Sequence, residues 1–362
     1  QVTLNSVEDT YDNLISIDGI TTSEVSMADA AVKVTSNIDK TKLDTLRGDT
    51  TGTVTVADIT EDKTDLGTIS KYGDVDLTTA NISVTGNVSK AEADTIDLYN
   101  STSGTVTLST VTDTFANIKL LHEDTSISIA SAAVTVTNAA SLANAGTLNG
   151  YTSGQVTLNS VEDTYDNLIS IDGITTSEVS MADAAVKVTS NIDKTKLDTL
   201  RGDTTGTVTV ADITEDKTDL GTISKYGDVD LTTANISVTG NVSKAEADTI
   251  DGYNSTSGTV TLTSITDTVD NVEAVRTDAT ISLASSTITV TDAASLANAT
   301  TFNNATSAQV TLNSVEDTYD NLISIDGITT SEVSMADAAV KVTSNIDKTK
   351  LDTLRGDTTG TV

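Results

Sequence analysis

The strongest constraint on this chain is that it repeats itself almost without change. Residues Gln1–Asp97 recur identically as Gln155–Asp251, and Gln1–Val54 recur once more as Gln309–Val362. The copies are offset by 154 residues, from position 1 to position 155 and on to position 309. Because a fixed period overrides a domain count based on length, we expect a repeat architecture rather than two or three ordinary domains.

A shorter period lies inside the long one. The related motifs Gln-Val-Thr-Leu and Thr-Val-Thr-Val/Leu begin at Gln1, Thr53, Thr105 and Gln155, at spacings of 50 to 52 residues. Units of this size stack on their neighbours, so we predict one continuous stack without separate globular domains. The predicted repeats are 1–52, 53–104 and 105–154 in the first period (1–154), 155–206, 207–258 and 259–308 in the second (155–308), and 309–362 at the start of a third.

The first half of each short repeat is predicted to be a strand followed by a helix. Val2–Leu4 has the period-two alternation of a strand, and Asp9 with Thr10 then offers a cap for a short helix that carries Leu14. In the second half, Val25 and Val34 bound a second strand set that is broken by a polar turn.

A second helix is predicted to close the short repeat. It is expected to begin near Ser36–Asn37, to run through Ile38–Leu46 at helical spacing, and to stop at Gly48, where glycine adopts a left-handed cap at least cost. In the sister repeat, Ser89 and Glu92 have the spacing of a capping box.

Short strands and helices that alternate at a fixed period cannot bury their apolar faces alone. Stacking would pair the strands of adjacent repeats into parallel ladders and bury the Val, Ile and Leu positions. The predicted fold class is therefore a β-rich solenoid, with stacked coils like those of a parallel β-helix and short helical segments on one side.

The composition excludes several classes of function. The net charge of −33 disfavours nucleic acid and anionic membrane surfaces as partners, and it calls for cations that screen the repulsion between repeats. The chain has no Cys, so no disulfide stabilises it. No apolar run approaches the ~20 residues of a membrane helix, so we expect no membrane insertion.

Catalysis is not expected. The single histidine, His122, is replaced by Arg276 in the second period, and no Ser or Thr nucleophile has a base beside it. Where the third short repeats of the two periods differ, apolar positions stay apolar, whereas Lys119 becomes Glu273. This pattern predicts a scaffold rather than an enzyme, with no certain cofactor.

Calcium is the one cofactor for which the sequence offers candidates. Asp9, Asp12, Asp18 and Asp29 lie in turn-like places, and Ca²⁺ needs six to eight converging oxygens. The alternative is that these residues serve as helix caps and Asx-turns without a metal. Neither an EF-hand loop nor the Gly-Gly-x-Gly-x-Asp nonapeptide occurs in the chain.

Two further motifs suggest binding. Arg47, Gly48 and Asp49 form a tripeptide that is a candidate for receptor binding, although the predicted helix stop at Gly48 explains the glycine equally well. Thr-x-Thr pairs, as at Thr53 and Thr135, resemble the threonine arrays of ice-binding solenoids, although Thr also alternates with Val on any half-exposed strand.

The repeat resembles a known kind of unit. Val134-Thr-Val-Thr-Asn-Ala-Ala-Ser-Leu-Ala-Asn-Ala and Ile265-Thr-Asp-Thr-Val-Asp-Asn-Val are similar to the Val-x-Val-Thr-Asp-x-Ala-x-x-Leu units of very large repetitive secreted surface proteins of Gram-negative bacteria and cyanobacteria. The resemblance implies β-solenoid adhesin or filament repeats at the cell surface or outside the cell, often exported in one step. That family has no shared catalytic set, so no functional residue carries over.

These observations predict a structural, extracellular scaffold of a bacterium. Its repeats would form the body of a surface filament, sheath or surface layer and would associate with one another into a fibre or lattice. Two alternatives stay open. The repeats could be the stalk of a giant adhesin whose binding domain lies elsewhere, or an ice- or mineral-binding solenoid.

Overall fold

The chain folds into short parallel strands and short helices. A computed structural model describes residues 2–20, 25–174, 179–328 and 333–362. Two compact units make up the chain: unit 1 comprises residues 1–162 and 166–185, and unit 2 comprises residues 163–165 and 186–362. Every strand pairing described within either unit is parallel, as the sequence predicts.

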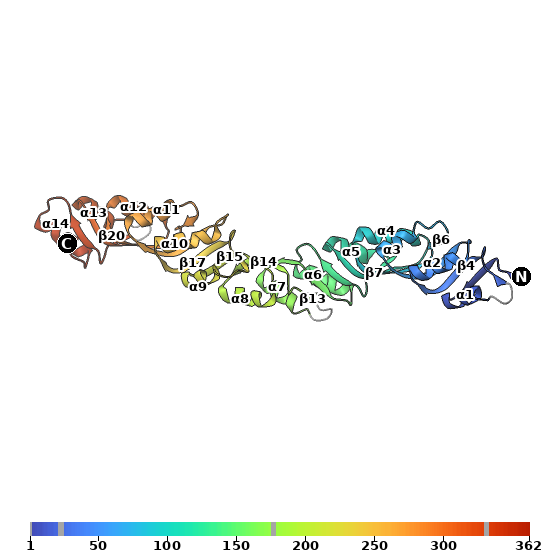
Figure 1. The fold of residues 1–362 in the computed structure, drawn as a ribbon. Helices are drawn as coiled ribbons and strands as arrows, with labels where there is room; N and C mark the ends of the chain where they lie inside the picture. The colour runs from blue at the N-terminus through green and yellow to red at the C-terminus, as the bar shows by residue number, and fades with distance from the viewer. Residues whose placement is uncertain (1, 21–24, 175–178, 329–332) are drawn as a thin grey trace. The chain divides into compact units, whose positions relative to one another are not determined.

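The elements follow one another in a regular order along the chain (Figure 1). The strands are β1(Val2–Thr3), β2(Ser6–Asp9), β3(Val25–Ser26), β4(Ala31–Ile38), β5(Val54–Asp62), β6(Val75–Asp76), β7(Asn81–Val88), β8(Val106–Asp113), β9(Ile127–Ser128), β10(Ala133–Val136), β11(Val156–Leu158), β12(Ser160–Asp163), β13(Val179–Ser180), β14(Ala185–Ile192), β15(Val208–Asp216), β16(Val229–Asp230), β17(Asn235–Val242), β18(Val260–Asp267), β19(Ile281–Ser282), β20(Thr287–Ala294), β21(Val310–Asp317), β22(Val333–Ser334) and β23(Ala339–Val342). The helices are α1(Tyr11–Asp18), α2(Lys40–Asp49), α3(Lys63–Ile69), α4(Lys90–Asp97), α5(Phe115–Glu123), α6(Leu142–Tyr151), α7(Tyr165–Asp172), α8(Lys194–Asp203), α9(Lys217–Ile223), α10(Lys244–Asp251), α11(Val269–Thr277), α12(Leu296–Ala305), α13(Tyr319–Asp326) and α14(Lys348–Asp357), with the 3-10 turns η1(Leu98–Asn100) and η2(Gly252–Asn254).

Each short repeat contains two strand–helix modules. In residues 53–104, the leading module is β5 followed by α3, and the trailing module is β6 and β7 followed by α4. Neighbouring modules are in register, because Val54 is the Cα partner of Val32 in β4 and Ile59 is the partner of Ile82 in β7. The structural unit is thus half of the 50-to-52-residue repeat seen in the sequence.

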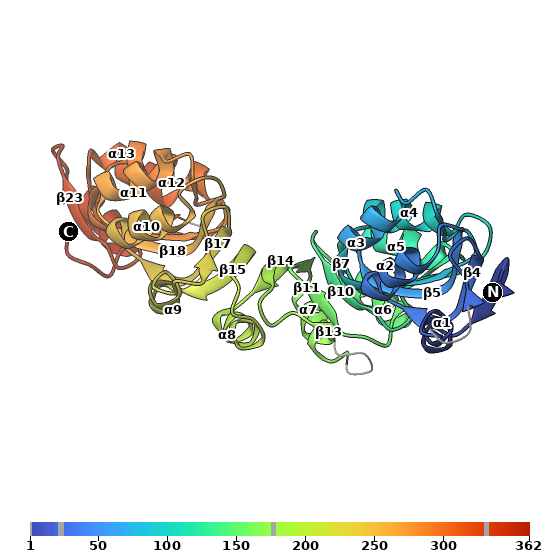
Figure 2. The same cartoon turned by 45° about the vertical axis from the view of Figure 1, so that its right-hand side comes forward.

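One face of each sheet is covered by helices, and the other is open to solvent. In unit 1 the strands lie in the order β11-β10-β8-β7-β5-β4-β2, and helices α2 to α5 lie along one side of them (Figure 2). Along β4, Val32 and Val34 are buried beneath the helices, whereas Lys33 and Thr35 are exposed. Parallel sheets usually have both faces covered, so the polar outer face explains why these strands alternate instead of being continuously apolar.

The local sequence explains most of the helix boundaries. Helix α1 follows Thr10 and buries Leu14, as predicted. The capping box predicted at Ser89 and Glu92 is present at the start of α4. The predicted start of α2 at Ser36–Asn37 is wrong, because these residues belong to β4.

Helix α2 instead begins after Asp39 and does not stop at Gly48. The Asp39 side chain accepts a hydrogen bond from Lys42 N, and Gly48 lies inside the helix, which ends at Asp49. Thr50 then turns the chain, because its Oγ1 donates to the carbonyl oxygen of Ala30 at 2.6 Å. The predicted left-handed cap at Gly48 is therefore wrong, and a side-chain hydrogen bond to the neighbouring turn replaces it.

A glycine lies two residues after Thr50. Gly52 packs so closely against the backbone that a Cβ there would collide with the Ala30 carbonyl group. Its amide donates to Thr50 Oγ1 at 3.0 Å, which completes the turn. Close approach of two backbones, rather than a left-handed conformation, is the physical reason for this glycine.

Candidate functional site

Carboxylates at the strand ends join each leading module to the module before it. Asp113 Oδ2 accepts from Lys90 N at 2.8 Å, at the start of the preceding helix α4. Its Oδ1 accepts from Thr114 N and from Asn117 Nδ2, both at 2.7 Å, at the start of its own helix α5. Burial alone would raise the pKa of Asp113, but these hydrogen bonds from Lys90, Asn117 and Thr114 hold it below its ordinary value. One carboxylate thus caps two helices.

The same double cap recurs in unit 2. Asp267 accepts from Lys244 N at 2.9 Å, and Asp317 accepts from Leu296 N at 3.0 Å. Both also accept from the first residues of their own helices. The recurrence shows that strand-end carboxylates connect modules in both units.

The calcium candidates have separate surroundings. Asp9 Oδ1 accepts from Thr10 N at 2.7 Å and from Asn13 Nδ2 at 2.8 Å, so it acts as a cap. Asp12 is exposed in the first turn of α1, and Asp29 accepts from a threonine hydroxyl of the next turn. The side chain of Asp18 lies outside the described residues. Among those that are described, no three His, Cys, Asp or Glu side chains are grouped to hold a metal ion.

The Arg47-Gly48-Asp49 tripeptide lies in the last turn of α2. The Arg47 guanidinium makes a bidentate contact to Asp74, with Nε–Oδ2 at 3.1 Å and Nη2–Oδ1 at 2.9 Å. It also lies over the ring of Tyr72, 3.7 Å from the centroid. Arg201 of unit 2 repeats both contacts. The arginine therefore connects its helix to the following module, and receptor binding by the tripeptide stays a prediction.

The threonines of the Thr-x-Thr pairs lie on the open face of the sheet. In unit 1, Thr135 of β10 is paired with Thr112 on one side and with Thr157 on the other, so three hydroxyl-bearing residues form a row across the strands. The equivalent row on β4 is occupied by Lys33, whose Nζ contacts Glu8 at 2.8 Å. Charged rows therefore interrupt the hydroxyl rows.

The leading module at the N-terminal edge of unit 1 has an uncovered apolar surface. Val2 is 55% exposed, whereas its copies Val156 and Val310, in identical sequence, are fully buried. The copies differ because Val156 is paired with Val134 of the preceding trailing module as well as with Val179, whereas the described pairing of Val2 is with Val25 of β3. The burial of these valines therefore depends on a preceding trailing module.

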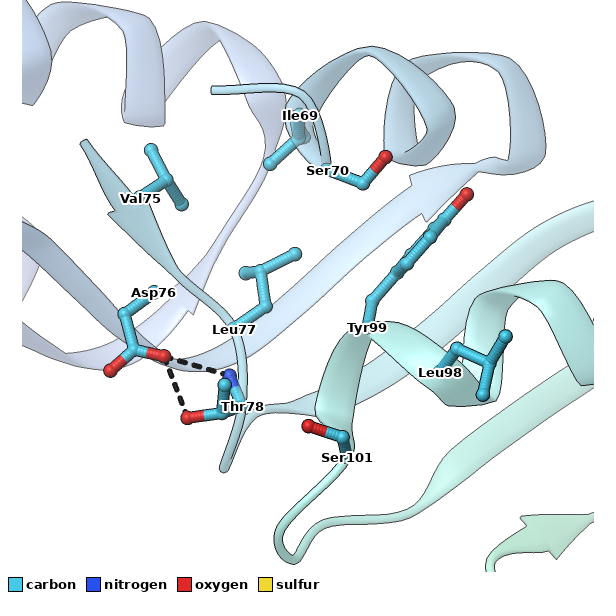
Figure 3. Close-up of a pocket in the computed structure, with 9 residues that line it drawn as sticks. All are labelled: Ile69, Ser70, Val75, Asp76, Leu77, Thr78, Leu98, Tyr99 and Ser101. Atoms are coloured by element: carbon cyan, nitrogen blue, oxygen red, sulfur yellow. Dashed lines mark hydrogen bonds between the residues drawn. The ribbon is translucent and has the colours of Figure 1, made fainter. Parts of the chain in front are cut away.

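A surface hollow of about 250 Å³ lies between α3, β6 and η1 in unit 1 (Figure 3). Its apolar base includes Ile69 and Leu77, which are 1% and 5% exposed. The ring of Tyr99 forms a wall of the hollow, beside Leu98, which is 73% exposed. The residues at its margin carry hydroxyl or carboxylate groups: Ser70, Asp76, Thr78 and Ser101.

Unit 2 contains the same hollow, with a volume of about 270 Å³. Tyr253 takes the place of Tyr99, and Gly252 replaces Leu98. The sequence contained a signal for this site, because Leu98 interrupts an otherwise identical stretch of the two periods. That signal was missed because the aromatic residue beside it has no recognisable motif.

His122 makes a ring contact with a tyrosine of the next helix. Its ring stacks on that of Tyr151, with centroids 3.9 Å apart and the planes 14° from parallel. Both residues lie in the last turns of neighbouring helices, α5 and α6.

Comparison with known proteins adds no relative. No protein-family model, no curated protein and no solved structure matches the chain. Among the described residues, no helix is long and apolar enough to span a bilayer.

Proposed function

We propose that this chain is a structural scaffold without catalytic activity, built as a solenoid of stacked modules. Its repeats would form the body of an extracellular filament, sheath or surface layer of a bacterium. The parallel register between modules and the caps shared between them support this proposal. The register and the shared caps both act between neighbouring modules, so a stack gains stability with every module that is added.

The observation that carries the proposal is the contrast between the edge of unit 1 at Val2 and the copies of that edge further along the chain. The apolar strand residues at this edge are buried wherever a trailing module precedes them, as Val156 and Leu158 are against β10. Asp9 likewise caps only its own helix, whereas Asp113 caps two. The edge thus carries both the apolar contacts and the spare carboxylate that a preceding module would use.

Sedimentation velocity of the 362-residue chain across a range of concentrations tests the proposal. We expect oligomers that grow with concentration, since a trailing module of one copy can cover the edge of the next. Val2→Lys together with Val7→Lys should reduce association, because both residues lose exposure wherever a module precedes them. Thr3→Lys is the matched control, because Thr3 is on the same strand with its side chain toward the opposite face.

Electron microscopy of the native material then separates the scaffold from the adhesin stalk. A continuous fibre or lattice built from this chain is expected. Separate rods with a globular head, combined with a monomer at every concentration, would contradict the proposal.

A further inference from the structure

Tyr99 stands between two hollows that the stacking of modules does not use. The first is the hollow of Figure 3, and the second, of about 500 Å³, lies on the other side of the residue between α3 and α4. The second hollow is lined by Lys63 and Glu92, which form an ion pair at 2.7 Å, and by two threonines and an isoleucine. Tyr253 has two equivalent hollows in unit 2.

The fold does not require an aromatic ring at this position. The residue lies just before the polar side chain that bonds to a carbonyl group of the preceding turn: Thr50 to Ala30, Asn100 to Ala80, and Thr306 to Ser286. The residues that precede those three are Asp49, Tyr99 and Ala305. Since a carboxylate or a methyl group serves equally well there, the ring of Tyr99 is free for another role.

We propose that the hollows around Tyr99 and Tyr253 bind the neutral sugar units of a polysaccharide. The apolar face of a pyranose ring packs against an aromatic ring, and its hydroxyl groups need donors and acceptors at the margin of the site. Ile69, Leu77 and Tyr99 supply the apolar surfaces, while Ser70 and Ser101 supply hydroxyl groups. Two hollows that share one ring suit two successive sugar units of a chain.

The negative charge of the protein favours neutral sugars over acidic sugars. A net charge of −33 repels sulfated and uronic acid polymers. At the site itself, Asp76 is held by Thr78, whose backbone N and Oγ1 donate to Asp76 Oδ1 at 2.9 and 2.7 Å. Lys63 and Glu92 neutralise each other while still offering a donor and an acceptor. Neutral hexose or N-acetylhexosamine units fit this surface.

The chain contains this binding site more than once, which increases its overall affinity for a polymer. A hollow with a tyrosine wall is described in each of the two complete 154-residue periods, so the chain offers two sites to a polymer of many identical sugar units. Binding by the whole chain should therefore exceed binding by either site alone.

Affinity electrophoresis of the 362-residue chain in native gels tests this proposal. The gels contain soluble starch, hydroxyethyl cellulose or glycol chitin, and titration calorimetry with maltohexaose, cellohexaose and chitohexaose measures affinity. We expect retardation by at least one of the three polymers. Tyr99→Ala should weaken binding by about tenfold, and the pair Tyr99→Ala with Tyr253→Ala should abolish it.

Two matched controls separate binding from folding. Tyr151→Ala changes a tyrosine at the equivalent position, but one whose ring is stacked on His122, and it should leave retardation unchanged. Leu98→Gly introduces the glycine that the second period has at this position, so the fold tolerates it. The affinity of the site at Tyr99 should then equal the affinity of the site at Tyr253. Circular dichroism of each variant establishes that it is folded.

The proposal is overturned if none of the three polymers retards the chain. It is also overturned if the folded double variant binds as the parent does, or if Tyr151→Ala weakens binding as much as Tyr99→Ala. None of these results bears on the association of modules, because both tyrosines lie away from the strand edge.

Discussion

The first copy of the repeat and its second copy within unit 1 share one sequence but not one environment. Val2 is 55% exposed and Val156 is fully buried, although the residues that follow each are identical. The difference lies in the neighbouring strands, because Val156 is paired with both Val134 and Val179, whereas the described pairing of Val2 is with Val25. The comparison teaches that much of the burial in a module is supplied by the module before it.

The arginines of the repeat show that the opposite side of a module also depends on its neighbour. Arg47 bonds to Asp74 of the following module, whereas Arg355, in identical local sequence, has no ion pair among the described residues. Both sides of a module are therefore completed by its neighbours, which the following substitutions measure.

The largest effect is expected for Val156→Asp compared with Val2→Asp. A carboxylate at position 156 would be buried without a partner, which costs about 3–5 kcal/mol of unfolding free energy. The same change at Val2 leaves the carboxylate in water and should cost less than about 0.5 kcal/mol. Urea denaturation of both variants measures the difference, and equal losses would contradict the role of the neighbouring module.

A smaller effect is expected for Asp113→Ala compared with Asp9→Ala. Asp113 caps two helices and Asp9 caps one, so we expect losses of about 2 kcal/mol and about 1 kcal/mol at pH 7. Urea denaturation at pH 7 gives both values. Equal losses would mean that the bond from Lys90 N contributes nothing.

The pH dependence of stability checks the same carboxylate. The pKa of Asp113 is lowered in the folded chain, so its stabilisation is present above the ordinary pKa of about 3.9 and is lost as the pH falls through the folded value. The parent should therefore lose more stability between about pH 5 and pH 2 than Asp113→Ala does. Parallel pH profiles for the two proteins would show that the cap is not the cause.

The sequence predicted the regular part of this architecture. Alternating valines such as Val32 and Val34 predicted a strand with one buried face, and the spacing of Ser89 and Glu92 predicted the capping box. Local chemistry determines both features, so a single repeat contains the necessary information. The boundary at Ser36 was misplaced because polar residues occupy both the outer face of a strand and the start of a helix.

The features that the sequence did not predict depend on contacts between modules. Nothing near Thr50 in the sequence indicates that its hydroxyl group reaches Ala30, twenty residues earlier. The role of Asp113 as a cap of the preceding helix, and the hollow beside Tyr99, likewise require the register between modules. Such contacts become visible only when neighbouring modules are placed together.

A moderate effect is expected for Arg47→Ala compared with Arg355→Ala. The first variant loses a bidentate contact to Asp74 and the packing over Tyr72, which together should be worth about 1 kcal/mol for a partly exposed arginine. The second variant should unfold as the parent does. Differential scanning calorimetry measures both, and a loss for Arg355→Ala as large as that for Arg47→Ala would show that the contact to the following module is not what matters.

The smallest effect, and the only stabilising one, is expected for Asp357→Asn. Burial, with a further contribution from the charge of Asp326 in the neighbouring helix, raises the pKa of Asp357. Its ionised form is therefore disfavoured in the folded chain, and the resulting destabilisation appears as the pH rises through the folded pKa. At pH 7 the neutral amide should add a few tenths of a kcal/mol to the unfolding free energy.

The stability gained by Asp357→Asn should disappear at low pH. Below about pH 3 the parent carboxyl group is protonated in both the folded and the unfolded chain, so Asp357→Asn should match the parent there. Asp352→Asn is the control in the same helix, because Asp352 pairs with Lys348 at 2.5 Å and should lose rather than gain stability at pH 7. A gain for Asp357→Asn that persists unchanged at low pH would exclude the ionised carboxylate as its cause, since burial and the charge of Asp326 both disfavour only the ionised form.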